Sequence, residues 1–114
     1  MTVDEYRLIA LSQPEAVEGS HMNHPDFRVR NKIFATILSI EIQEGMVKLT
    51  PAQQKEFMKD HPKIFSPAAG SWGKNGATIV QITLATNDIV NRAMTLAWQN
   101  VSPKRLIAQI DREA

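Results

Sequence analysis

The sequence predicts an α+β fold in which an antiparallel sheet of about five strands has helices packed on one face. Segments that alternate apolar and polar residues are clustered along the chain instead of alternating singly with helices, which favours antiparallel pairing. The chain has 114 residues, so we expect residues 1–114 to form one domain. A content of 43% hydrophobic and 22% charged residues is that of an ordinary globular protein. The expected order is one helix, three or four strands, a helix, a strand and two final helices.

The first helix is expected over residues 3–12. Thr2 and Glu5 fit a capping box, in which both side chains satisfy backbone donors at the start of a helix. Pro14 ends the helix, because the residue before a proline is pushed out of the helical region. The apolar positions recur at helical spacing: Val3, Tyr6, Ile9 and Ala10.

A meander of strands follows this helix. Asn31 is a plausible turn residue because asparagine tolerates a positive φ, and Glu44-Gly45 is typical of a tight turn. The pattern is weak in the first segment, which we interpret as a short edge strand, and it alternates clearly in parts of the others. The segments are 16–22, 27–30, 33–43 and 46–49.

The second half begins with the clearest local signal, because Thr50 to Gln53 form a capping box with a proline in the first helical position. This predicts a helix over residues 51–60. We interpret residues 65–76 as a glycine-rich loop, a length that is often functional in compact domains. Residues 77–84 alternate and predict another strand.

Two helices end the chain. Asn87 or Asp88 is expected to cap a long helix with a continuous apolar stripe, of which Trp98 is a core member. Ser102-Pro103 breaks this helix and starts a short one. Phe27, Phe34, Met58 and Met94 are the other large side chains that we expect in the core.

Composition and motifs exclude several classes of function. There is no cysteine, so disulfides, thiolate zinc sites and thiol nucleophiles are excluded. The motifs Gly-x-Ser-x-Gly, Gly-x-Gly-x-x-Gly and the Walker loop are absent. We therefore expect a protein that is not an enzyme and needs no cofactor. With neither an apolar secretory leader nor a stretch long enough to span a membrane, we expect a cytoplasmic location and no membrane partner.

The histidines offer a weak indication of a metal site. His21 and His24 lie three residues apart, with Asp26 nearby. On a strand or an irregular loop this spacing places the two rings on opposite faces, and no further ligand is evident. We therefore expect these histidines to be structural or exposed, and no bound metal.

Basic residues suggest a nucleic-acid surface instead. Arg28 and Arg30 are expected on one face of a strand, Lys32 would extend their row, and Lys48 is expected on a nearby strand. Trp72 beside Lys74 adds a possible stacking platform for a base. The simpler interpretation is a solvated sheet face, on which lysine and arginine discourage edge pairing. The net charge of +1 means that any binding must come from such a local patch.

Short motifs along nearly the whole chain resemble the MmcQ/YjbR family. They are His24-Pro25, Phe27-Arg28-Val29, Lys32-Ile33-Phe34-Ala35, Val47-Lys48-Leu49, Phe65-Ser66-Pro67-Ala68, Gly70-Ser71-Trp72-Gly73, Gly76-Ala77-Thr78, Ala97-Trp98 and Pro103-Lys104-Arg105-Leu106. The resemblance implies a fold like that of CyaY and of type III secretion chaperones, and a DNA-binding label that rests mainly on fold analogy. Two positions depart from the family pattern: its Gly-His-Pro is Asn23-His24-Pro25 here, and Ala77 replaces a frequent aromatic residue.

Three functional hypotheses follow from the sequence. The leading one is a weak, largely sequence-independent DNA or RNA binder that uses the basic residues and Trp72. The alternative is a protein-interaction or chaperone-like module, either a monomer or a weak homodimer, that uses the sheet or a helix groove. The third is an enzyme or small-molecule binder built around His24, Lys32 and the 66–76 loop.

Overall fold

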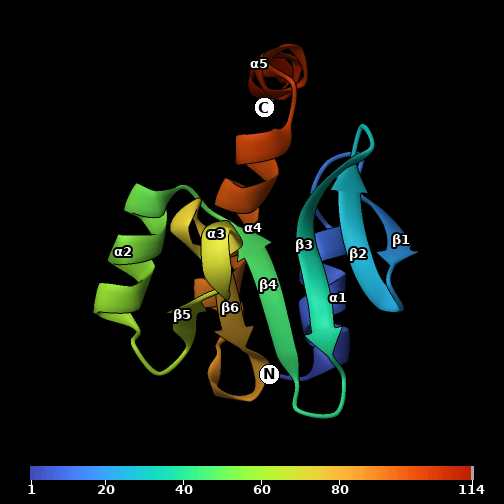
Figure 1. The fold of residues 1–114 in the computed structure, drawn as a ribbon. Coiled ribbons are helices and arrows are strands. Elements are labelled where there is room, and N and C mark those ends of the chain that lie inside the picture. Colours follow the sequence, from blue (N-terminus) through green and yellow to red (C-terminus); the bar gives the residue numbers. More distant parts are fainter. Residues whose placement is uncertain (114) are drawn as a thin grey trace.

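A computed structural model describes residues 1–113 and contains one antiparallel sheet of six strands, in the order β1-β2-β3-β4-β6-β5 (Figure 1). The strands are β1 (Val17–His21), β2 (His24–Val29), β3 (Lys32–Ser39), β4 (Glu44–Lys48), β5 (Phe65–Pro67) and β6 (Ala77–Gln81). The helices are α1 (Val3–Leu11), α2 (Pro51–Asp60), α3 (Gly70–Lys74), α4 (Asn87–Val101) and α5 (Lys104–Glu113), with a short 3-10 helix at Ile82–Leu84. The predicted α+β class and antiparallel sheet are confirmed.

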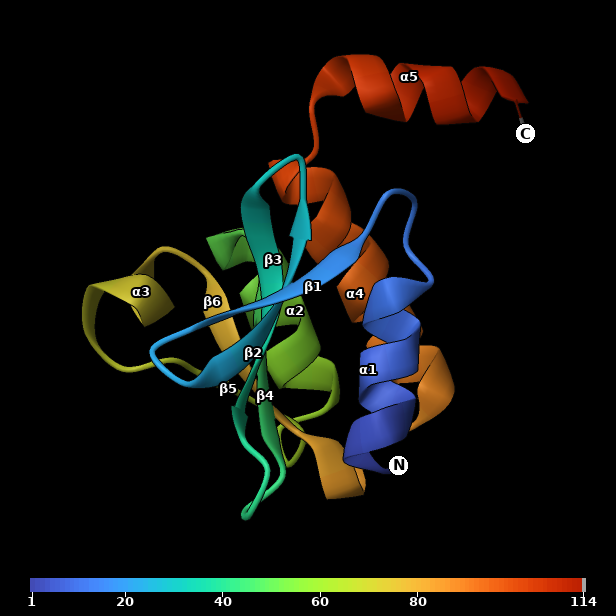
Figure 2. The same cartoon turned by 90° about the vertical axis from the view of Figure 1, so that its right-hand side faces the viewer.

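One face of the sheet forms the core with α1 and α4. Figure 2 shows these two helices together on one side of the sheet, with α3 on the other side. Side chains alternate along each strand, so every second residue faces the helices. The buried strand residues of the core include Phe27, Val29, Ala35, Ile37, Val47 and Val80. Helix α4 adds Val90, Ala93, Met94, Ala97 and Trp98, which confirms the predicted apolar stripe.

Capping determines where the helices begin. Both predicted capping boxes are present, at Thr2 with Glu5 and at Thr50 with Gln53, and α2 has the predicted bounds. The predicted cap of α4 is wrong, because Thr86 takes that position and its hydroxyl accepts from the N–H of Ile89. A capping residue has an extended backbone, as Thr86 has, whereas Asn87 is already the first residue of the helix.

Helix α1 is fastened to the sheet by Tyr6. Its buried hydroxyl donates to the carbonyl oxygens of Met46 at 3.1 Å and Thr36 at 3.3 Å, which belong to β4 and β3. Burial raises the pKa of this hydroxyl, so it stays a donor. Gly45 leaves room for the ring, since a Cβ there would lie 2.5 Å from the Tyr6 oxygen.

The turn between β3 and β4 lies earlier than predicted. Strand β3 ends at Ser39, residues 40–43 make the connection with Gln43 at a φ of +55°, and β4 begins at Glu44. The predicted turn at Glu44-Gly45 is therefore wrong. Gly45 is small because Tyr6 packs against it, not because the chain reverses there.

The predicted loop over residues 65–76 is also wrong, because it holds both β5 and α3. Strand β5 pairs with β6, and this raises the number of strands to six. Gly73 allows α3 to pack closely, since a Cβ there would lie 1.8 Å from the backbone oxygen of Ala68. Strand β6 ends at Gln81 instead of at the predicted residue 84, because Ile82–Leu84 form the 3-10 helix.

Over residues 1–113, no helix has the length and apolar character needed to cross a membrane.

We expect Gly45→Ala to lower the free energy of unfolding by about 1–3 kcal/mol, because the added methyl group overpacks the buried Tyr6 ring. Tyr6→Phe should cost about 1 kcal/mol by removing a buried donor. In the Tyr6→Phe background the Gly45→Ala cost should shrink, because one of the clashing atoms is gone. Urea unfolding of the four proteins tests this; strictly additive costs would contradict the proposed contact.

Candidate functional site

A cavity of about 580 Å³ lies on the sheet face that α1 and α4 leave uncovered. Strands β3, β4 and β6 contribute to its lining, together with α3, the end of β1 and the last two residues of α4. The turn between β1 and β2 reaches toward the side on which α3 lies (Figure 2). The apolar lining includes Met22, Ile33, Met46, Leu49, Trp72 and Val101. The cavity is therefore built from segments that are far apart in the sequence.

The central polar residue of the lining is Thr36. It lies on β3 directly across from Met46 of β4, and it is 0% exposed. Its hydroxyl has no hydrogen-bond partner within residues 1–113. Leaving a buried hydroxyl unpaired costs about 1–3 kcal/mol. A ligand that forms a hydrogen bond with this hydroxyl would remove that cost.

The rim of the cavity carries one aromatic ring and one cation. The Trp72 side chain on α3 is 69% exposed, and Lys48, at the end of β4, is exposed as well. Asn100 from α4 also lines the cavity, but its amide donates to the Lys48 carbonyl at 2.9 Å and to the Gln53 side chain at 2.8 Å. Lys48 makes no ion pair with any carboxylate in the described part of the chain.

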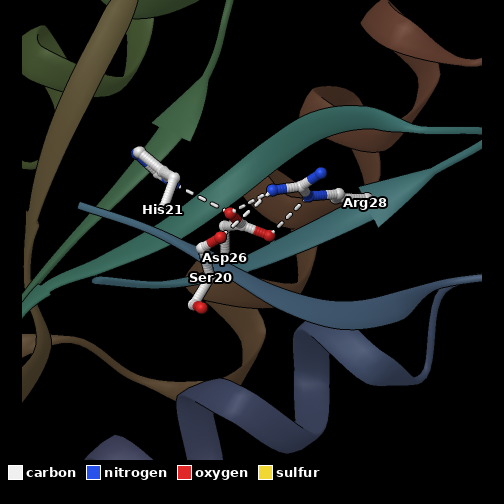
Figure 3. Close-up of polar contacts among 4 residues, drawn as sticks. All are labelled: Ser20, His21, Asp26 and Arg28. Carbon is white, nitrogen blue, oxygen red and sulfur yellow. Dashed lines mark hydrogen bonds and ion pairs between the residues drawn. The ribbon is translucent and has the colours of Figure 1, made fainter. Parts of the chain in front are cut away.

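A buried carboxylate organises the β1–β2 side of the cavity (Figure 3). Asp26 is 0% exposed and accepts two hydrogen bonds from Arg28, at 2.8 and 2.9 Å. His21 Nδ1 lies 2.8 Å from Asp26 Oδ2, the oxygen that also accepts from Arg28 Nη2. The hydrogen bonds from Arg28, and secondarily the one with His21, hold the pKa of Asp26 below its usual value despite desolvation. Asp26 is therefore a carboxylate at neutral pH.

This arrangement gives His21 a fixed orientation. Figure 3 shows the ring with its Nδ1 edge toward Asp26 and the rest of the ring pointing away from it. His21 is also one of the residues that line the cavity. The expectation that His21 and His24 point to opposite faces is wrong, because their ring centroids are 6.2 Å apart. A tight turn separates the two residues and pairs them across β1 and β2, whereas the expectation assumed one continuous strand or irregular loop. Within residues 1–113, no group of three or more histidine, aspartate or glutamate side chains is placed to hold a metal ion.

The structure does not assemble the predicted basic row. Arg28 is paired with Asp26, and Arg30 is paired with Glu15 at 2.7 Å. Arg30 lies in a turn with Asn31, at φ values of +49° and +69°, so it does not share a strand face with Arg28 as predicted. A two-residue hairpin of this kind needs two left-handed residues, and Arg30 supplies the first of them.

The other predicted contacts are divided between the cavity and the surfaces around it. Lys32 lies directly across from buried Val29, and alternation along β3 directs it away from the cavity that Ile33 lines. Lys48 and Trp72 both line the cavity, and Lys74 is exposed on α3 outside its lining. Of the family motif, His24 starts β2 and Pro25 follows, but neither lines the cavity. Trp72 and Asn75 of the 66–76 segment line the cavity together with His21, not with His24.

Sequence reasoning missed Thr36, and it considered Asp26 only as a carboxylate near the histidines, not as the buried partner of Arg28. Thr36 interrupts an apolar run from Ile33 to Leu38, and this isolated polar residue in a buried strand was the available signal. Asp26 precedes Arg28 by two residues, which places both on one face of a strand, but the sequence alone does not show that the carboxylate is buried.

Comparison with known proteins agrees with this description. A family model described as YjbR matches residues 11–100. The chain belongs to the YjbR family. The matched range includes all six strands, α3 and nearly all of the cavity lining. The family predicted from the short motifs is thereby confirmed.

A solved structure shares this YjbR fold. The crystal structure of Deinococcus radiodurans protein DR2400, with the family-model domain DUF419, superimposes with a TM-score of 0.74 at 17% identity. The alignment covers 91% of this chain and 80% of that chain. At this identity the likeness shows the fold alone. No curated protein matches the chain significantly.

We expect Thr36→Val to raise the free energy of unfolding by up to about 1 kcal/mol, because it replaces an unpaired buried hydroxyl with a methyl group of similar shape. The matched control is Thr78→Val. The buried Thr78 hydroxyl donates to the Gly76 carbonyl at 2.7 Å and also pairs with Gln54, so its loss should destabilise by about 1–3 kcal/mol. Urea unfolding measures both; equal losses would show that the Thr36 hydroxyl is already satisfied.

We expect Asp26→Asn to cost about 3 kcal/mol at pH 7, because it leaves Arg28 without its buried partner. A lowered carboxyl pKa stabilises the fold above the ordinary aspartate pKa of about 4, and this contribution is lost as the pH falls through the lower folded pKa. The difference from wild type should therefore narrow below about pH 4. The control is Glu15→Gln in the exposed pair with Arg30, which should cost less than about 1 kcal/mol. A pH-independent difference would contradict this assignment.

Proposed function

We propose that this YjbR-family chain is a non-enzymatic binding protein and that the cavity on the open sheet face is its binding site. The observation that supports this most directly is a largely apolar cavity of about 580 Å³ lined by a buried, unpaired hydroxyl. Ligand sites typically have volumes of about 300–1,000 Å³, apolar walls and a few placed polar groups. Here the polar residues of the lining are Thr36, Lys48, His21, Asn75 and Asn100.

Two features favour binding over catalysis. Nucleophilic catalysis needs a hydroxyl within hydrogen-bond reach of a base, and Thr36 makes no such bond to His21 or to any other group in residues 1–113. The Asp26 carboxylate is shared between Arg28 and His21, which is a satisfied structural arrangement. A cofactor is not needed for this function. The cytoplasmic location expected from the sequence stays a prediction.

A flat neutral probe tests the proposed site. We expect 2-naphthol to bind wild type and to shift the NMR signals of residues that line the cavity, Trp72 among them. Ala77→Phe should abolish this binding, because the added ring points into the cavity from β6.

Ser66→Phe is the matched control for that variant. Ser66 lies directly across from Ile79 on the same open face but outside the cavity lining, so the added ring should leave binding unchanged. Probe signals that move equally in all three proteins, or that do not move at all, would overturn the proposed site.

The second candidate is weak binding of single-stranded nucleic acid. The exposed Trp72 ring and the unpaired Lys48 ammonium lie on the same cavity, and Lys74 is on the helix that carries Trp72. A base could stack on the indole while one or two phosphates contact these lysines. Arg28 and Arg30 are paired with carboxylates, so fewer cations are free to contact phosphates than the sequence predicts.

This candidate predicts a shallow dependence on salt. With one or two phosphate contacts, the slope of log K against log salt should be about −0.7 to −1.4 for single strands. Fluorescence anisotropy of labelled DNA and RNA across a salt series measures it, with Lys48→Gln as the variant and Lys32→Gln as the control on the other face. Binding that is insensitive to both salt and Lys48→Gln would reject the candidate.

A protein partner is favoured by a separate apolar surface. Ile40 and Ile42 are exposed in the β3–β4 connection, and Leu84 is exposed in the 3-10 helix. These segments adjoin, since the Ile82 N–H donates to the Gln43 carbonyl. Sedimentation across a concentration series separates a monomer from a weak homodimer. If this surface mediates self-association, Ile42→Ser should weaken the dimer. Wild-type and Ile42→Ser proteins that are both monomeric at every concentration would exclude it.

A further inference from the structure

We infer that the cavity binds a flat, largely apolar molecule that carries an anionic group at one end and a hydroxyl at the other. In this assignment Lys48 binds the anion and Thr36 binds the hydroxyl. The inference rests on the proposed function of the cavity and adds the chemical class of its ligand.

The charge of the lining favours an anion. Lys48 is the one lysine or arginine among the residues that line the cavity, and no aspartate or glutamate is among them. The nearest buried carboxylate, Asp26, is already compensated by Arg28. A ligand carboxylate beside Lys48 therefore meets an unpaired ammonium group and no repelling charge from the lining.

The unpaired hydroxyl defines the second polar contact. Thr36 Oγ1 can both donate and accept, which matches a ligand hydroxyl. It lies just beneath the cavity surface, across from Met46. Met46 is its cross-strand neighbour in the same lining, and its unbranched, flexible side chain can make room for a ligand that approaches the hydroxyl.

Strand geometry sets the distance between the two contacts. Thr36 is paired with Met46, and Lys48 lies two residues further along β4. Two residues span about 7 Å along a strand, and the Lys48 side chain lengthens this reach. Exposed Trp72 and buried Met46 line the same cavity, so a fused aromatic ring can lie against both.

Three probes isolate the two polar contacts: 6-hydroxy-2-naphthoate, 2-naphthoate without the hydroxyl, and the methyl ester of the first without the charge. We expect 6-hydroxy-2-naphthoate to bind wild type most tightly in calorimetric or NMR titrations. Lys48→Gln should weaken both naphthoates about tenfold and leave the ester unchanged. Thr36→Val should weaken the two hydroxyl-bearing probes about fivefold and leave 2-naphthoate unchanged.

Lys74→Gln is the matched control, because it removes a lysine from α3 without touching the cavity lining. If the three probes bind equally and neither cavity variant changes them, the ligand class is wrong while the site stands. If Lys74→Gln mimics Lys48→Gln, the anion is held by the general field of the surface, and the assignment to Lys48 is overturned. If neither these probes nor 2-naphthol bind, the proposed function itself fails.

Discussion

The arrangement of the open face depends on the buried carboxylate of Asp26. A charge without access to water is tolerated only when it is paired and hydrogen-bonded, so Arg28 must fold back over the strand and His21 must turn toward it. These bonds join β1 to β2 and set the orientation of one residue of the cavity lining. They also take Arg28 out of the set of cations available to a polyanion. One ion pair thus shapes the site and limits its charge.

The asymmetry of the sheet explains why a cavity exists at all. The helix-facing side is closed by α1 and α4, with Tyr6 fastened to two strands and Gly45 leaving it room. In the described residues 1–113, the other side is covered at its margins by α3, by the end of the β1–β2 hairpin and by the last residues of α4. Close packing on one face and partial cover on the other leave space over β3 and β4.

The sequence predicted the features that local physics decides. Caps at Thr2 and Thr50, the stripe that includes Trp98, and the clustered strands depend on neighbours along the chain, and all are confirmed. The errors arise where contacts between distant residues decide. Gly45 looked like a turn because Tyr6, 39 positions away, was not visible as its neighbour. Helix α3 in the predicted loop depends on packing against Ala68, and Gln54 of α2 donates to the Gly73 carbonyl.

The two buried polar residues at the centre of the open face have opposite status. Asp26 and Thr36 are directly paired across β2 and β3. Both carboxylate oxygens of Asp26 accept hydrogen bonds from side chains of the fold, whereas the Thr36 hydroxyl has no partner in residues 1–113. A valine would fit the same strand without that unpaired group. Sequences usually avoid such local conflicts, and those that persist tend to lie at functional sites. Because this one lies in the lining of an apolar cavity beside an unpaired lysine, its natural explanation is a ligand that completes the hydrogen bond.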